Sequence, residues 1–172
     1  AVTLKRLAAG TGAAKVTRSM PNLAVAVGSG VTEWVASRAV SKIEKQLVKK
    51  IFRAVGLELE VEQESLIGKL TTISGSGPAF FFYLTELLAT QAKRFGLNKR
   101  AANQIAVATL VGAGKLIAES TKSPADWRAA VTSKKGITEA AFKHLKKKQF
   151  DRIFLAALER AKTRSDQLAK LV

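Results

Sequence analysis

The 172-residue chain has no cysteine and a single histidine, His144. This excludes disulfides and thiolate metal sites and speaks against a histidine-rich metal site or a Ser-His-Asp triad, so we expect no bound metal. No apolar run approaches the roughly 20 residues of a membrane span and no charged-then-apolar leader opens the chain, so we expect a soluble, cytoplasmic protein with no membrane partner.

The net charge is +16 at pH 7. A strongly basic balance can indicate a nucleic-acid partner. Here Lys and Arg are spread along the whole chain, with the densest cluster at residues 143–152, and aromatic residues do not alternate with them. We therefore interpret the charge as a solvated basic face and keep a basic nucleic-acid-binding protein as an alternative.

Residues 1–62 read as an incomplete α/β segment with room for about three strands. The patterns predict a helix that stops at Gly10, a strand over 14–20 that Pro21 and Asn22 break, a second strand after the glycines at 28–30, and a third over 57–62.

Between the second and third strands, Ser41 and Glu44 have the spacing of a capping box, which starts a helix. An apolar stripe of three turns follows and is expected to face the core. Gly56 is expected to end this helix as a left-handed cap. The stripe consists of Ile43, Leu47, Ile51 and Val55, with Val48 and Phe52 beside them.

Residues 63–172 read as about five or six consecutive helices. Pro78 suits the first turn of a helix over 78–95, whose early turns are apolar on every side and therefore belong in a core or an interface. Asn98, and Ser123 with Pro124 and Asp126, mark further helix starts, and the last two helices are expected over 138–148 and from 150 to the end.

Two glycine-bearing bends each precede a helix. The first, Ser74 to Pro78, reads either as a tight turn whose glycines take positive φ, or as a segment that exposes backbone N–H groups to an anion or cofactor. It matches neither a phosphate-binding P-loop nor the dinucleotide fingerprint.

The second bend is "VTSKKGITEAAF", residues 131–142. Thr138 is either the cap of the next helix or a functional hydroxyl. In the functional reading, the amides around Gly136 to Thr138 hold a carboxylate and the Thr138 hydroxyl hydrogen-bonds the reacting group.

In combination, "SGSGPAFFFYLTELLATQAKRFGL", "VTSKKGITEAAF" and the earlier "RSMPNLAVAVGSGVTEW" resemble the pyrroline-5-carboxylate reductase family over about residues 3–170. The resemblance implies a mainly α fold: a helical dimerisation domain of the 6-phosphogluconate dehydrogenase C-terminal-like type over 63–172, preceded by the tail of a Rossmann domain over 1–62.

The resemblance also implies a function: reduction of 1-pyrroline-5-carboxylate to L-proline with NADPH or NADH, in proline biosynthesis, by a homodimer that forms larger rings in some members. The positions that match the family's site are Thr138 as the catalytic residue; Ser133, Gly136, Ile137 and Thr138 for substrate; Ser74, Gly75, Ser76, Gly77 and Pro78 as a wall; and Met20, Pro21 and Asn22 on the cofactor side.

The sequence departs from the family's pattern in two places. No segment of the sequence shows a strand followed by the G-x-G-x-x-G motif and a helix. About the first hundred residues of the family's pattern are therefore missing, as expected for a fragment or for a stand-alone relative. Lys135 replaces the first of two glycines in the substrate loop; it costs about 1–2 kcal/mol if φ is positive there, or it adds an attractive charge for the carboxylate. A non-enzymatic helical oligomerisation module derived from the fold remains an alternative.

Overall fold

The computed structural model describes residues 2–170, and these divide into two compact units that we treat separately. The first unit is built from the described residues up to Pro78 and from Ala156 onwards, and the second from Ala79–Leu155. The fold is mainly helical with one small sheet, as predicted.

The first unit contains the sheet, in the order β1 (Thr17–Pro21), β2 (Gly30–Ala36), β3 (Gly56–Glu60). β1 and β2 are antiparallel and are joined by the short 3-10 helix η1 (Leu23–Val27), whereas β2 and β3 are parallel. A parallel pair needs a crossover, and α2 (Lys42–Arg53) provides it. The three predicted strands are confirmed, with ends shifted by a few residues.

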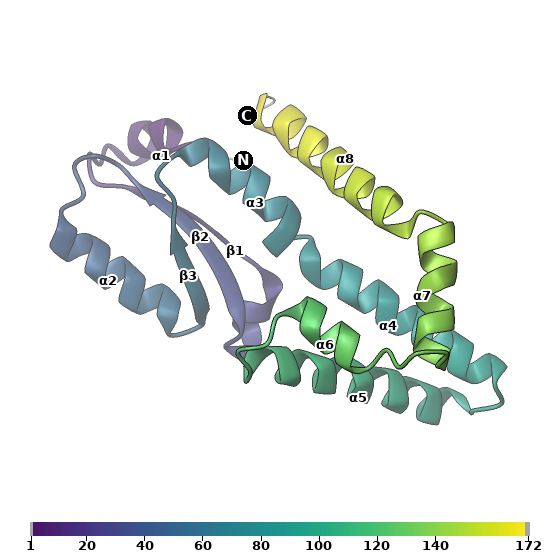
Figure 1. Cartoon of the computed structure of the whole chain (residues 1–172). Coiled ribbons are helices and arrows are strands. Elements are labelled where there is room, and N and C mark those ends of the chain that lie inside the picture. Colours follow the sequence, from purple (N-terminus) through teal and green to yellow (C-terminus); the bar gives the residue numbers. More distant parts are fainter. Residues whose placement is uncertain (1, 171–172) are drawn as a thin grey trace. The chain divides into compact units, whose positions relative to one another are not determined.

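Opposite faces of this sheet are covered by α2 and by α3 (Glu64–Ser74), as Figure 1 shows. On the α2 face, the fully buried Trp34 packs its ring 6.3 Å from that of Phe52 and donates its indole N–H to Glu58 Oε2 at 2.8 Å. On the other face, Val35 and Val61 pack with Ile67 of α3. The side chains alternate between the two faces, as a strand requires.

The predicted apolar stripe of α2 is buried at one edge and exposed at the other. Ile43, Leu47 and Ile51 are 84%, 60% and 57% exposed, contrary to the prediction. Val48, Phe52 and Val55 are half-buried, and the Phe52 ring packs against Trp34, as predicted. Lys45 and Lys49 pair with Glu60 of β3 at 2.7 and 2.9 Å, and these ion pairs favour packing through the edge that carries Val48 and Phe52.

Gly56 does not cap α2, contrary to the prediction. The C-cap is Ala54 in the right-handed helical region, and Gly56, with φ of 141°, opens β3. A Cβ at Gly56 would overlap the backbone of Gly30 on the neighbouring strand. Glycine is therefore required here by its φ and by the close approach of two strands.

The second unit is helical. It contains α4 (Gly77–Arg94) from Ala79 on, α5 (Lys99–Ala118), α6 (Pro124–Ala130), α7 (Ile137–Lys147) and the first turns of α8 (Phe150–Lys170). Asn98 caps α5, and Ser123 with Asp126 forms a capping box on α6, as predicted. Phe80 of α4 lies edge-on against Phe154 of α8, with ring centroids 5.1 Å apart.

Much apolar surface of this unit remains uncovered within the chain. Phe81, Phe82 and Tyr83 of α4 are 56%, 58% and 60% exposed, although the sequence predicts burial in a core or an interface. α5, with a mean hydropathy of 1.3 over its most apolar 18-residue window, is by length and composition long and apolar enough to cross a membrane, contrary to the expectation that no run would be. Its many small residues equally suit close packing against other helices.

The α2 capping box generates a prediction about acid stability. Hydrogen bonds from Lys15, then from the Ser41 backbone and hydroxyl, lower the pKa of Glu44 from 4.5 to about 2. Because the pKa is lower in the folded state, the stabilisation is complete above pH 4.5 and is lost as the pH falls towards 2. Glu44→Gln keeps a capping side chain but does not titrate, so its urea midpoint is expected to fall less over this range.

The measurement is the urea midpoint of wild type and variant at several pH values, with Glu86→Gln, at an exposed position of α4, as the matched control. Parallel pH profiles for wild type and Glu44→Gln would contradict the prediction.

Candidate functional site

The second glycine-bearing bend forms a loop between α6 and α7, residues 131–136. We call it the substrate loop, after the role that the family resemblance predicts for it. Its first residues continue from α6: the N–H of Val131 donates to the Trp127 carbonyl at 3.2 Å, and the Thr132 N–H donates to that of Ala129 at 3.0 Å. The Thr132 hydroxyl also donates to the Arg128 carbonyl at 2.6 Å. The loop therefore leaves α6 in a fixed direction.

The chain then reverses within a few residues. The N–H of Gly136 donates to the Ser133 carbonyl at 3.0 Å, and Lys135 between them has a φ of 61°. The suspected positive φ at this position is thus confirmed, and lysine bears the cost that glycine avoids. Gly136 itself has a φ of −83°; it is glycine because a Cβ would overlap Ser133 Oγ and lie 3.0 Å from the Ser133 carbonyl oxygen.

Thr138 is not the helix cap. α7 begins at Ile137 with Gly136 as its N-cap, and no side chain caps the helix. Thr138 is therefore the second helical residue, half-buried, and its hydroxyl is available for another role. The capping interpretation of Thr138 is wrong.

Only some of the predicted backbone donors are free. The Gly136 N–H is taken by Ser133, and the Lys135 N–H donates to Glu139 Oε2 at 2.9 Å. For the N–H groups of Ile137 and Thr138 the described part of the chain offers no acceptor, as expected for the first residues of a helix. An anion at this helix end would therefore meet the Ile137 and Thr138 amides, in the positive field of the helix dipole.

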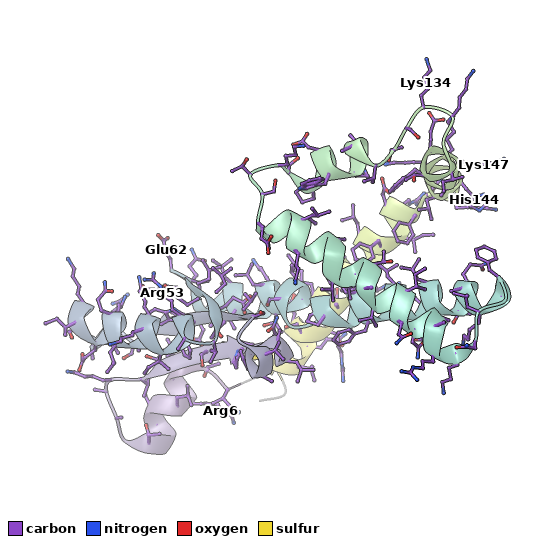
Figure 2. The ribbon with its side chains drawn as sticks, turned by 90° about the horizontal axis from the view of Figure 1, so that it is seen from below. Arg6, Arg53, Glu62, Lys134, His144 and Lys147 are labelled. Carbon is purple, nitrogen blue, oxygen red and sulfur yellow. The ribbon has the colours of Figure 1, made fainter. Side chains whose placement is uncertain are left out.

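Basic side chains belong to the loop itself. Lys134 projects from its tip (Figure 2), and Lys135 follows. The Arg128 guanidinium lies 5.7 Å from the Phe142 ring centroid and so links α6 to α7. Lys143 donates to Glu139 Oε2 at 3.0 Å; this hydrogen bond and that from the Lys135 backbone lower the pKa of the Glu139 carboxyl. The charges favour an anionic ligand.

In the first unit, Asn22 ties three segments together. Its side-chain oxygen accepts from the N–H groups of Ala24 and Val31 at 3.2 and 3.1 Å, and its amide nitrogen donates to the Ser74 carbonyl at 3.0 Å. β1 includes Pro21 and so ends one residue later than predicted, and Asn22 caps η1. The cofactor-side segment and the first glycine-bearing bend are therefore in direct contact through this one side chain.

The glycines of that bend do not take positive φ, contrary to the prediction. Gly75 is right-handed, with φ of −74°, and α4 starts at Gly77. Both the Gly75 and Ser76 N–H groups donate to the Thr71 carbonyl, at 2.9 and 3.0 Å. A Cβ at Gly75 would press on Thr71, 2.9 Å from its carbonyl oxygen, so this glycine allows a close approach.

Met20 and Ser76 share a cavity of about 730 Å³ within the first unit. Strand β1, helix α3 and the second half of α8 line it, with Thr71, Thr72 and Arg164 among its polar residues. Sequence reasoning missed these three residues because nothing local shows that α8 returns to α3, where the Ser165 hydroxyl donates to the Gly68 carbonyl at 3.1 Å. It also missed Glu139, whose only signal is an acidic residue at the third helical position.

The comparisons identify the family. Residues 64–168 match the family model described as pyrroline-5-carboxylate reductase dimerisation, a helical domain in keeping with α3 to α8. The chain belongs to the pyrroline-5-carboxylate reductase family.

Individual relatives agree. The pyrroline-5-carboxylate reductase of Pseudomonas aeruginosa is 34% identical over 155 residues, which cover 90% of this chain and 57% of that protein. A solved structure of the Coxiella burnetii enzyme superposes with a TM-score of 0.90 at 36% identity, over 96% of this chain and 62% of that one. The Plasmodium falciparum enzyme, solved with NADP bound, gives 0.83 at 25% identity, over 95% and 66%. The chain thus spans 57% to 63% of the length of three curated relatives that it matches.

The Asn22 contacts predict a graded loss of stability. Asn22→Asp keeps the two accepted hydrogen bonds but replaces the donor to Ser74 with a carboxylate, and is expected to lower the free energy of unfolding by about 1–2 kcal/mol. Asn22→Ala loses all three side-chain bonds and is expected to cost about 2–3 kcal/mol. Urea denaturation measures both, and a loss in Asn22→Ala no larger than in Asn22→Asp would contradict the assignment.

Gly136→Ala tests the close contact in the substrate loop. The added methyl group must displace Ser133, so hydrogen exchange in residues 131–138 is expected to increase. Gly10→Ala is the matched control, because a Cβ there meets nothing within 4 Å and alanine favours the α1 (Leu4–Thr11) helix. Unchanged exchange in Gly136→Ala would show that the loop has room for a side chain.

Proposed function

We propose that this chain supplies the substrate-binding and dimer-forming part of an enzyme that reduces 1-pyrroline-5-carboxylate to L-proline with NADPH or NADH, in cytoplasmic proline biosynthesis. One observation carries the proposal: a helix start at which the described part of the chain offers no acceptor for the N–H groups of Ile137, Thr138 and Glu139, with the half-buried Thr138 hydroxyl, a serine and lysines nearby. Family membership gives the reaction.

The substrate carboxylate binds at the start of α7. Its oxygens accept from the N–H groups of Ile137 and Thr138, and the Ser133 hydroxyl is a third donor from across the reversal. Gly136 does not donate to the substrate, because its N–H group already donates to the Ser133 carbonyl. Its role is that the absence of a side chain lets Ser133 lie close to the start of α7. Lys134 and Lys135 add positive charge that draws an anion to the loop.

The ring is then held between a hydroxyl and an apolar side chain. Hydride addition to the imine carbon moves the C=N π pair onto nitrogen, which takes one proton and ends as a secondary amine. The Thr138 hydroxyl hydrogen-bonds this nitrogen, which fixes the ring's orientation. Ile137, whose side chain is 92% exposed, covers the ring's methylene groups.

A nicotinamide cofactor, when bound, supplies the hydride. Met20 suits such a group as an apolar wall, because it is 42% exposed and lines the cavity of the first unit with Ser76. Asn22 is less suited to bind ribose or phosphate directly, because its oxygen already accepts two hydrogen bonds. We therefore assign Asn22 to holding Pro21 and the Ser74–Pro78 wall in place.

The exposed apolar surface of α4 and α5 supports a homodimer. A monomer that left so many large side chains in water would be prone to associate. We propose that residues 63–172 form the dimerisation and substrate domain, that residues 1–62 end the dinucleotide-binding domain, and that dimers assemble further into rings. The exposed residues are Phe81, Phe82, Tyr83, Leu84, Leu87, Leu88, Ile105, Val107, Val111, Leu116 and Ile117.

Thr138→Ala in the complete enzyme is expected to lower kcat/KM for the imine about 100-fold, within the range of a lost orienting group, while the Kd for NADPH stays unchanged. Thr138→Ser, which keeps the hydroxyl, is the matched control and retains most activity. Steady-state kinetics and cofactor titration measure both.

Two outcomes would count against the proposal. Loss of NADPH affinity in Thr138→Ala would mean that Thr138 faces the cofactor. A wild-type enzyme that forms dimers but oxidises no NADPH or NADH with the imine would favour the non-enzymatic oligomerisation module.

A further inference from the structure

The substrate loop contains a strained residue. Lys135, with φ of 61°, and Gln149 are the non-glycine residues with positive φ in the described part of the chain. Such a conformation persists only where the surrounding contacts fix it, and it is common at ligand-binding sites. The contacts that fix Lys135 therefore decide the shape of the loop.

Glu139 provides the contact. One oxygen of its carboxylate, Oε2, accepts from the backbone N–H of Lys135 at 2.9 Å and from the Lys143 ammonium at 3.0 Å. The side chain is 29% exposed, so most of it is shielded by the loop and helix. Lys143 lies one turn along α7 and holds the carboxylate from the other side.

The arrangement is a capping box displaced by one residue. A glutamate at the third helical position normally accepts from the N–H of the N-cap residue. Here the N-cap is Gly136, and its N–H already donates to the Ser133 carbonyl. The carboxylate reaches instead to Lys135, the residue before the cap, and so fixes the residue in which the chain reverses.

We propose that Glu139 is a positioning residue for the substrate loop: it holds Lys135 in the left-handed conformation and thereby places Ser133 opposite the free N–H groups of Ile137 and Thr138. The ligand is the carboxylate of the imine, so the inference rests on the proposed function. Glu139 acts through Lys135 and touches neither substrate nor cofactor.

The direction in which KM changes when Glu139 is removed distinguishes a positioning role from a purely electrostatic one. A carboxylate beside an anion site repels the anion, so if charge were its only influence, removing it would tighten substrate binding. Removing a positioning group loosens the loop and weakens substrate binding. The two roles therefore predict opposite changes in KM.

The experiment uses the complete enzyme with NADPH and compares four variants: Glu139→Ala, Glu139→Gln, Lys135→Gly and the double variant Glu139→Ala with Lys135→Gly. Glu139→Ala is expected to raise KM for the imine about 5- to 20-fold with kcat changed less than about 2-fold. Glu139→Gln, which keeps an acceptor for the Lys135 N–H, is expected to raise KM less than about 3-fold.

Rescue of KM by glycine at position 135 distinguishes positioning of the loop from a merely structural role of Glu139, which glycine would not restore. Glycine takes positive φ without strain, so Lys135→Gly is expected to bring KM in the double variant back to within about 2-fold of Lys135→Gly alone. Glu119→Ala, at an exposed glutamate that follows α5, is the matched control and leaves KM unchanged. A lowered or unchanged KM in Glu139→Ala, or no rescue by glycine, would overturn the inference.

Hydrogen exchange followed by mass spectrometry gives a readout that does not require turnover. Exchange over residues 131–138 is expected to speed up about 5-fold or more in Glu139→Ala and to stay as in wild type in Glu119→Ala. Unchanged exchange in Glu139→Ala overturns the inference even in an active enzyme. A wild type that does not reduce the imine, but in which Glu139→Ala still loosens the loop, overturns the proposed function and leaves the role of Glu139 in shaping the loop supported.

Discussion

A helix starts with N–H groups that its own backbone cannot satisfy, and the candidate substrate site depends on which of these stay free at α7. The reversal at Lys135 and Gly136 uses two of the nearby donors internally, on Glu139 and on Ser133. The donors of Ile137 and Thr138, followed by that of Glu139, remain. The loop can reverse tightly and leave these donors accessible because Lys135 adopts a strained backbone conformation and Gly136 has no side chain.

In the first unit, one amide side chain has a comparable role. Asn22 ends β1, caps η1, bonds to β2 and reaches the last carbonyl of α3. The family resemblance places Met20, Pro21 and Asn22 beside the cofactor. Internal contacts fix Asn22, whereas the exposed Met20 lines the cavity of the first unit. In both units, polar groups that look like ligands in the sequence are partly used to hold the backbone, and their neighbours carry the free surface.

Local signals predicted the helix starts well and the helix faces less well. The capping boxes at Ser41 and Ser123 were found because the residues that form them lie three positions apart. The packing face of α2 was predicted only in part: Val48 and Phe52 face the sheet, but Ile43, Leu47 and Ile51 do not. Local periodicity does not show the pairing of Lys45 and Lys49 with Glu60, 11 to 15 residues away on β3. The predicted positive φ in the Ser74–Pro78 bend was wrong because α3 continues as a right-handed turn through Gly75, whose place is explained by its close approach to Thr71.

The same limit applies to the site. The family resemblance indicated the substrate loop. Neither the resemblance nor the residue types showed that the Gly136 N–H donates to the Ser133 carbonyl, or that the Glu139 carboxylate accepts from the N–H of Lys135 rather than from that of the N-cap residue. This geometry shows where part of the basic charge lies relative to the candidate site. Glu139 is paired with Lys143, and Asp151 on α8 is paired with Lys146. The negative charges of these two carboxylates are therefore compensated locally and do not neutralise the lysines at the loop tip. Lys134 and Lys135 lie beside the free amides at the start of α7, an arrangement that suits the small carboxylate we propose as ligand. Extended binding of a polyanion would also need aromatic or regularly spaced basic residues, which the sequence lacks here.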